Sequence, residues 1–216
     1  MSHGGRGRCL HVEEIDRGVD MTGTPRIPKA ELTGIRGRLV KIVTRRMFGV
    51  VPEPLEVMWH HPTAVMDSSA FGRKVNKWNR ADASLKSFAH MAVASLVGCT
   101  WCLDFGYFHA HNDGLDEVKA REVPRWRESG VFTPLERRVM EYAEAMSQTP
   151  PTVTDEMVSA LHAELGAPAL VELTNWIAFA NMATRGNNAL GIEAQGFAAA
   201  CELRPLAQRS DVGSPA

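Results

Sequence analysis

Two cysteines separated by two residues, Cys99 and Cys102, occur in the stretch VGCTWCLDFGYFHAHN, which also contains His109 and His111. Two thiols one helical turn apart can form a disulfide or relay a reactive sulfur between them, as in C-x-x-C redox pairs. The same four side chains could instead bind zinc, or the thiols could be inert members of a core helix. The two histidines point about 160° apart on a helical wheel, and their spacing differs from the common zinc-finger patterns. We therefore favour redox chemistry without a bound metal or cofactor.

The cysteine pair is expected at the junction of two helices, where one helix ends and the next begins. Gly98 can end one helix, so the next begins near Cys99, where unpaired N–H groups and the helix dipole stabilise a thiolate. Trp101 is expected on another face of this helix. At 100° per residue, one sector about 100° wide contains Cys99, Cys102, Gly106, His109 and Ala110. Glycine inside a helix costs about 1 kcal/mol against alanine, so Gly106 predicts either close packing or a substrate pocket beside the thiols.

Composition argues against several functional classes. Hydrophobic residues make up 44% of the chain and charged residues 23%, as in ordinary globular proteins. With 24 basic and 25 acidic residues, the chain has no excess of positive charge to hold nucleic acid or an anionic membrane. No apolar run reaches a bilayer-spanning length, and no apolar signal-peptide core follows the N-terminus. We expect a cytoplasmic protein with neither a nucleic-acid nor a membrane partner.

Helical periodicity dominates the chain, and we predict an all-α fold. Helical spacing of i, i+3, i+4, i+8 relates Leu39, Ile42, Val43 and Met47. A nearly complete apolar stripe of another helix contains Leu85, Phe88, Ala89, Ala92, Val93, Leu96 and Val97.

Two further helices have recognisable ends. Thr133-Pro134-Leu135-Glu136 is a capping box with proline at the first helical position, and it predicts a helix through about Ser147. Thr154 is expected to cap another helix, which Gly166 closes. The segment 167–184 is apolar almost all round, so we expect it to be buried.

The chain is predicted to form one domain. Residues 1–20 are glycine-rich and polar, which indicates a disordered N-terminal extension, and translation from Met21 is an alternative start. Residues 21–202 are expected to form a single all-helical domain, and residues 203–216 a flexible C-terminal tail.

The stretch LKSFAHMAVASLVGCTWCLDFGYFHAHNDGL resembles the central motif of the carboxymuconolactone decarboxylase-like family, the alkylhydroperoxidase D superfamily. The similarity runs from about Ile27 to Cys201 and includes EVMWHHPTAV and NMATRGNNALGI. The longer pattern, with VPRWRESGVFTPLERRVMEYAEAM and AQGFAAAC, is similar to a CxxC-containing subgroup. The resemblance implies a multi-helix bundle with the CxxC at the start of a central helix.

The resemblance also implies an activity. In the peroxidase branch of this family a CxxC pair reduces hydroperoxides and a thiol or disulfide-reducing partner resets it. Carried over, Cys102 is the attacking thiolate and Cys99 the resolving partner, although the helix terminus alone would favour Cys99 as the nucleophile. Family members assemble into oligomers, so we expect a homo-oligomer.

This chain departs from the family at the two proton-handling positions. The family pattern has a glutamate twelve residues before the first cysteine, where this chain has Ser87, and a histidine four after the second, where it has Gly106. His90 lies one turn after Ser87 on the same face and is a candidate replacement. His109 shares the cysteine face but starts about 10 Å of helix rise from Cys102, so only a water-bridged contact is expected.

Three further candidates belong to a substrate site. His61 before Pro62 could line a pocket, and Arg185 could bind a carboxylate or carbonyl. Gly106 would leave room for the substrate. Each also has a structural alternative, since Arg185 could satisfy its own helix end and His61 stands near a helix boundary.

Two other functions remain open beside a thiol peroxidase or disulfide reductase. The first is a carboxymuconolactone decarboxylase, which acts on a lactone carboxylate by proton transfer and does not need the cysteine pair. The second is a non-catalytic, redox-sensing helical oligomer. The CxxC favours the peroxidase, whereas Ser87 and Gly106 at the relay positions keep the alternatives open.

Overall fold

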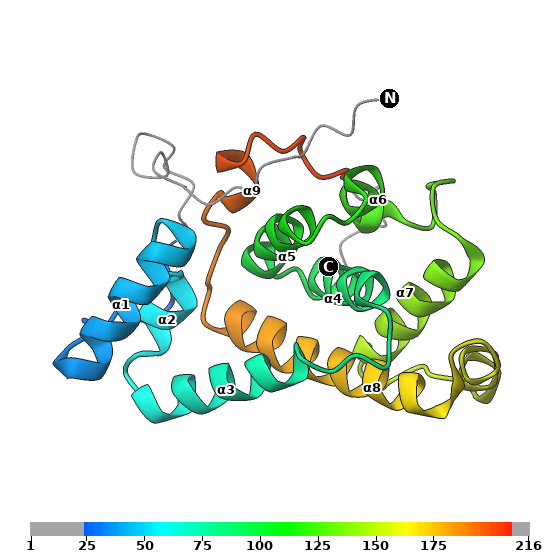
Figure 1. Cartoon of the computed structure of the whole chain (residues 1–216), viewed down its shortest axis with the longest axis horizontal. Helices are drawn as coiled ribbons and strands as arrows, with labels where there is room; N and C mark the ends of the chain where they lie inside the picture. Colours follow the sequence, from blue (N-terminus) through cyan, green and yellow to red (C-terminus); the bar gives the residue numbers. More distant parts are fainter. Residues whose placement is uncertain (1–23, 209–216) are drawn as a thin grey trace.

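The computed structural model describes residues 24–208, and it contains helices but no β-strand within that range (Figure 1). The all-α prediction is confirmed. The α-helices are α1 (Gly34–Phe48), α2 (Glu53–Met58), α3 (Pro62–Val75), α4 (Ala83–Val97), α5 (Thr100–Asn112), α6 (Glu117–Glu122), α7 (Pro134–Ser147), α8 (Asp155–Ala189) and α9 (Phe197–Ala200). A short 3₁₀ helix, η1 (Val123–Arg125), follows α6. Between residues 24 and 208, no helix is long and apolar enough to cross a membrane.

Helix α4 lies at the centre of the fold and packs against α5, α7 and α8. Its predicted apolar stripe is the reason, because the stripe supplies side chains to two hydrophobic clusters on different sides of the helix. The first cluster joins α4 to α7 and α8 and includes Leu85, Ala89, Val93, Val139, Ala143, Leu173 and Ile177. The second joins α4 to α5, η1 and α7 and includes Phe88, Met91, Tyr107, Ala110, Val123 and Met140.

The end of the described chain lies against the second cluster. Leu203 and Leu206 pack on it while partly buried, and the backbone N–H of Ala207 donates to the carbonyl oxygen of Arg121 at 3.0 Å. The predicted N-terminal extension of residues 1–20, and residues 209–216 of the predicted tail, lie outside the described residues.

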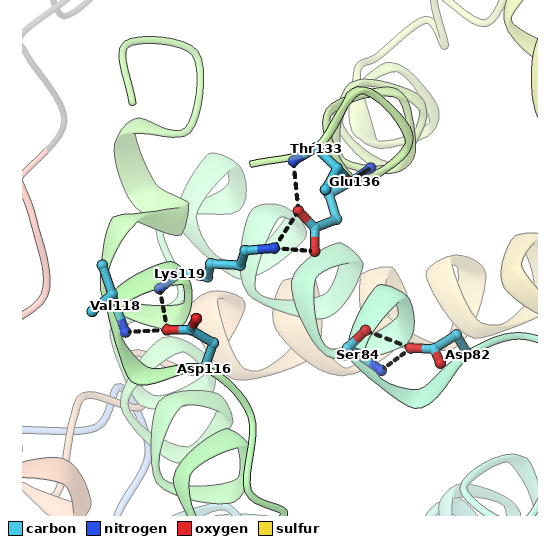
Figure 2. A network of polar contacts seen from close by, with 7 residues as sticks. All are labelled: Asp82, Ser84, Asp116, Val118, Lys119, Thr133 and Glu136. Atoms are coloured by element: carbon cyan, nitrogen blue, oxygen red, sulfur yellow. Dashed lines mark hydrogen bonds and ion pairs between the residues drawn. The ribbon is translucent and has the colours of Figure 1, made fainter. Parts of the chain in front are cut away.

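Side-chain caps set several of the helix starts (Figure 2). The predicted capping box is present: Glu136 N–H donates to Thr133 Oγ1 at 3.2 Å, and Thr133 N–H donates to the Glu136 carboxylate at 2.7 Å. The same carboxylate pairs with Lys119 Nζ at 2.7 Å, which ties α6 to the start of α7. Asp116 and Asp82 are simple N-caps of α6 and α4, and their carboxylates accept from backbone N–H groups of the first turn.

The turn between α4 and α5 has the predicted form. Gly98 ends α4 with φ 76° and ψ 26°, a left-handed conformation that glycine adopts without the penalty of a Cβ atom. The N–H of Cys99 bonds back to Ala94 at 3.0 Å, so the chain reverses tightly and α5 begins at once. Cys99 is the N-cap of α5, and its sulfur accepts from the N–H of Cys102 at 3.2 Å.

Helix α8 shows where the sequence prediction was right and where it was wrong. The helical run is broken at Gly166, with φ 73° and ψ 162°, as the predicted helix end there requires. The segment after the break is buried on one face only, because Val171 and Met182 are 61% and 50% exposed. The prediction of burial all round was therefore wrong.

Helix α1 is the second exception. Its helical periodicity is confirmed, but the apolar row faces solvent in the single chain, where α1 lies at the periphery (Figure 1). The exposed fractions along the row are Ile35 88%, Leu39 60%, Ile42 65%, Val43 44% and Met47 54%. We call these five residues the α1 row.

Candidate active site

Cys99 and Cys102 form a disulfide, with the two Cα atoms 5.3 Å apart. The prediction that they lie within one turn and can be bridged is confirmed. Both side chains are buried, at 1% and 2% exposed, and Trp101 packs against them at the start of α5. The sulfurs therefore sit at the junction of α4 and α5, sheltered from bulk water.

A cavity of about 440 Å³ lies beside this junction. Helices α2, α3, α4, α5 and α8 supply its walls, and most of the lining side chains are apolar. The apolar lining includes Leu55, Met58, Val65, Trp101, Phe105, Trp176, Phe179 and Met182. Trp176 is held in place because its indole N–H donates to the carbonyl oxygen of Lys86 at 2.8 Å.

The two altered relay positions and their two candidate replacements all line this cavity. Ser87 and His90 reach it from α4, and Gly106 and His109 reach it from α5. A Cβ atom on Gly106 would lie 3.3 Å from Met91 Cγ, which is a tight contact, so the glycine serves both the packing of α4 on α5 and the open space.

His90 is neutral at physiological pH. Burial, and then the neighbouring His109, lower its pKa to about 4. Its Nε2 atom is buried and has no hydrogen-bond partner, and its ring meets Trp176 edge-on with centroids 6.2 Å apart. The ring is thus a desolvated, uncharged group with one nitrogen free to exchange a proton.

The residue His109 as a whole is exposed, but its ring lies among aromatic rings and lines the cavity. Its ring centroid is 4.4 Å from that of Phe105 and 6.2 Å from that of Phe48. Partial burial of the ring among these neighbours lowers the pKa of His109, and Asp113 opposes the shift. His109 also contributes to the lowered pKa of His90, and both residues line the same cavity.

The residue that joins the cavity to the disulfide is Asn187, to which no pattern in the sequence points. Its side-chain N–H donates to the sulfur of Cys102 at 3.3 Å; the residue is 4% exposed and lines the cavity. Neither cysteine is itself among the lining residues. The sequence shows only two consecutive asparagines at this place, in RGNN; the second, Asn188, donates to the carbonyl oxygen of Val97 at 2.8 Å.

Trp101 was expected on a face of its helix other than that of the cysteines, and no place in a cavity was predicted for it. It lines the cavity, stacks on Phe105 with centroids 4.6 Å apart, and donates from its indole N–H to Gln195 Oε1 at 2.8 Å. The same amide oxygen accepts from the backbone N–H of Glu53 at 2.7 Å, so Gln195 fastens the cavity wall to α2.

His61 and Arg185 do not line the cavity. His61 caps α3, where its Nδ1 accepts from the N–H of Ala64 at 3.1 Å. Arg185 faces a different, open depression and donates to the carbonyl oxygen of Ser147. His61 therefore has the helix-boundary role named as its alternative, whereas Arg185 binds the end of α7 rather than the end of its own helix.

Within the part of the chain that the structure describes, no three His, Cys, Asp or Glu side chains are grouped to hold a metal ion. His111, the fourth member of the zinc alternative, is not a lining residue of the cavity.

Residues 68–145, which contain the cysteine pair, match the model of the Carboxymuconolactone decarboxylase family. The protein YnjA of Escherichia coli is 34% identical over 161 residues, which are 74% of this chain and 88% of YnjA.

Two solved structures share the fold at low identity. A peroxidase-related protein from Ralstonia eutropha, described as an alkylhydroperoxidase AhpD core, superposes with a TM-score of 0.69 at 16% identity, over 80% of this chain and 93% of that chain. The debrominase Bmp8 in complex with 2,3,4-tribromopyrrole superposes with a TM-score of 0.68 at 18% identity, over 79% of this chain and 92% of that chain. The AhpD-like helical fold is thus confirmed, and the two neighbours differ in the chemistry for which they are named.

Proposed function

Because the chain belongs to the carboxymuconolactone decarboxylase family, we propose that it is a thiol-dependent oxidoreductase that reduces organic hydroperoxides through Cys99 and Cys102. One observation carries the proposal: the sulfur of Cys102 is held by Asn187, a lining residue of the cavity that also contains His90 and His109. A bridged thiol pair, a neutral base and a space for substrate are thereby brought together.

In the proposed reaction the Cys102 thiolate attacks the outer oxygen of a hydroperoxide, ROOH. The O–O bond breaks, the sulfur becomes a sulfenic acid, and the leaving alkoxide takes up a proton to give ROH. The Cys99 thiol then attacks the sulfenic sulfur, which forms the disulfide and releases water. An external dithiol reduces this disulfide and is itself oxidised, so ROOH and a dithiol yield ROH, water and a new disulfide.

We assign the proton transfers to His90, with His109 in support. Ser87 and Gly106 carry no group that titrates near neutral pH, so they cannot act as the acid and base of the family pattern. A neutral imidazole can accept the thiol proton and return it to the alkoxide. The formation of a thiolate nearby would favour the protonated form of His90 and so assist the transfer.

The lining of the cavity suits an apolar substrate. Of the described residues that line it, Asp113 alone is acidic, and no lysine or arginine is among them. A carboxylate bound here would have no cation to compensate for the loss of its hydration. This disfavours the carboxymuconolactone decarboxylase alternative and supports an organic hydroperoxide with an apolar substituent.

The reduced protein treated with cumene hydroperoxide tests the proposal. We expect one cumyl alcohol per Cys99–Cys102 disulfide formed, measured by chromatography and peptide mass spectrometry. Cys102→Ser should form neither product, whereas Cys99→Ser should stop at a sulfenic acid that dimedone traps. Alcohol formation that survives in Cys102→Ser would refute the thiol mechanism. Disulfide formation without repeated turnover in the presence of a dithiol would favour the redox-sensing alternative.

We also propose that the protein is a homo-oligomer. Soluble monomers rarely leave a continuous row of large apolar side chains such as the α1 row in water. A second copy is the partner that every molecule in solution meets, and apolar burial of this kind drives association.

A further inference from the structure

Two consecutive asparagines near the end of α8 hold the α4–α5 junction from one side. Asn188 donates to the carbonyl oxygen of Val97, the last residue of α4. Asn187 instead donates to a sulfur atom, Cys102 Sγ, at 3.3 Å. A backbone carbonyl is an ordinary acceptor, whereas a disulfide sulfur is a weak one. The second contact therefore calls for a reason other than fastening the helix.

The acceptor strength of the Cys102 sulfur depends on its redox and protonation state. A thiolate carries a full negative charge, and hydrogen bonds to charged acceptors are roughly twice as strong as those between neutral groups. The Cys102 side chain is 2% exposed and Asn187 is 4% exposed, so water competes little for this contact. The hydrogen bond from Asn187 to the Cys102 sulfur is thus strongest when Cys102 is reduced and ionised.

Among the described residues that line the cavity, no positively charged side chain could stabilise a Cys102 thiolate in place of Asn187. The titratable groups that face the cavity are His90 from α4 and, from α5 and its C-cap, His109 and Asp113. Both histidines have lowered pKa values, and Asp113 is an acidic residue, which supplies no positive charge. The residues of α2, α3 and α8 that line the cavity carry no charge.

We propose that Asn187 is a catalytic residue that stabilises the Cys102 thiolate through its side-chain N–H. The contact makes Cys102 the nucleophile, because Asn187 also lines the cavity and so joins the stabilised sulfur to the substrate space. Cys99 receives the N–H of Cys102 at the helix terminus, so each sulfur has its own donor. The same preference for the thiolate favours the reduced pair over the disulfide. The role in turnover rests on the proposed function, but the thiolate stabilisation does not.

The test measures the Cys102 thiol directly in the full-length reduced protein. Alkylation by iodoacetamide is followed against pH, and peptide mass spectrometry assigns the rate to each cysteine. Asn187→Leu keeps a similar volume and removes the donor. We expect the Cys102 pKa to be higher in the variant than in the wild-type protein. At a pH below the Cys102 pKa of both proteins, alkylation of the variant should be about tenfold slower. The matched control is Asn188→Leu, which removes the neighbouring amide and should leave the Cys102 rate unchanged.

A second measurement uses the equilibrium with reduced and oxidised dithiothreitol. Asn187→Leu should shift the equilibrium constant toward the Cys99–Cys102 disulfide by about tenfold, since the variant no longer favours the thiolate. If Asn187→Leu does not fold, Asn187→Asp replaces the donor by an acceptor of the same shape, and the Cys102 pKa should rise further.

The outcomes separate this inference from the proposed function. A Cys102 alkylation profile in Asn187→Leu or Asn187→Asp that matches the wild-type profile would overturn the inference, whether or not peroxide is reduced. A raised Cys102 pKa supports it even if the wild-type protein reduces no hydroperoxide, which would refute only the proposed function. Equal shifts in the Asn187 and Asn188 variants would also overturn it, because they would reflect loosening of the junction.

Discussion

At the scale of single residues, His90 makes the stability of the protein depend on pH. Its pKa in the folded protein is about 4, because its ring is buried, whereas an unperturbed histidine titrates near 6.5. Between these values the unfolded chain binds a proton that the folded chain does not. The free energy of unfolding therefore falls as the pH is lowered from about 7 toward about 4.

We predict that His90 accounts for about 2 kcal/mol of stability lost between about pH 8 and about pH 5. Urea denaturation of the wild-type protein and of His90→Gln measures it, since glutamine does not titrate. The variant should lose correspondingly less stability over this interval. His162→Gln changes an exposed histidine outside the cavity and is the matched control. Parallel pH profiles for wild type and His90→Gln would contradict the assignment.

The proposed proton transfer gives a second prediction for the same residue. General acid–base catalysis is worth about 10² to 10⁴-fold, so His90→Ala should slow peroxide reduction by at least about tenfold. His109→Ala should have a smaller effect, because His109 starts about 10 Å of helix rise from Cys102. Ser69→Ala, which removes another polar lining group, is the control. Stopped-flow oxidation of the reduced protein measures all three variants. An unchanged rate in His90→Ala would contradict the proposed proton transfer by His90.

The residues of the site were predictable only where one helix holds them. The CxxC spacing predicted that the two cysteines can be bridged, and helical periodicity with the family resemblance pointed to His90, His109 and the two relay positions, which line one cavity. Asn187 could not be found in this way, because 85 residues separate it from Cys102 and only the packing of α8 on α5 brings them together. That Trp101 lines the cavity was not predicted, because the cavity extends around α5 beyond the cysteine sector.

At the scale of elements, the junction of α6 and α7 depends on one carboxylate. Glu136 accepts from the N–H of Thr133 and pairs with Lys119 (Figure 2). We predict that Glu136→Ala lowers the free energy of unfolding by about 1 to 3 kcal/mol, because it removes a cap and leaves a partly buried ammonium unpaired. Glu141→Ala on the exposed side of α7 should change it by less than about 0.5 kcal/mol. Urea denaturation of both variants is the measurement, and equal effects would contradict the prediction.

Helix boundaries were predictable because their signals are local. The capping box at Thr133, the left-handed Gly98 and the break at Gly166 each act within a few residues of the chain. Which apolar faces become buried is not a local property. The α1 row and the outer face of α8 have the same periodicity as buried stripes, but no other part of the described chain covers them.

At the scale of the whole molecule, the α1 row predicts concentration-dependent association. Leu39→Glu and Ile42→Glu place charges on a face that is already exposed, so they should not unfold the chain. We expect multi-angle light scattering to show an oligomer for the wild-type protein and a smaller species for each variant. Val118→Glu, at a residue 61% exposed on α6, should leave the mass unchanged. A monomeric wild-type protein would contradict the proposal.

The position of Trp101 gives the protein an optical reporter of its own chemistry. This indole packs against the Cys99–Cys102 bridge, and a disulfide in contact with an excited indole quenches its emission by accepting an electron. Reduction removes the quencher, so the protein should brighten when a dithiol opens the bridge and dim when an oxidant closes it. Tryptophan fluorescence during a titration with dithiothreitol checks this, with Trp101→Phe as the variant whose signal should no longer follow the bridge. The redox state of the sulfurs would then be readable in real time, without a dye or a coupled enzyme.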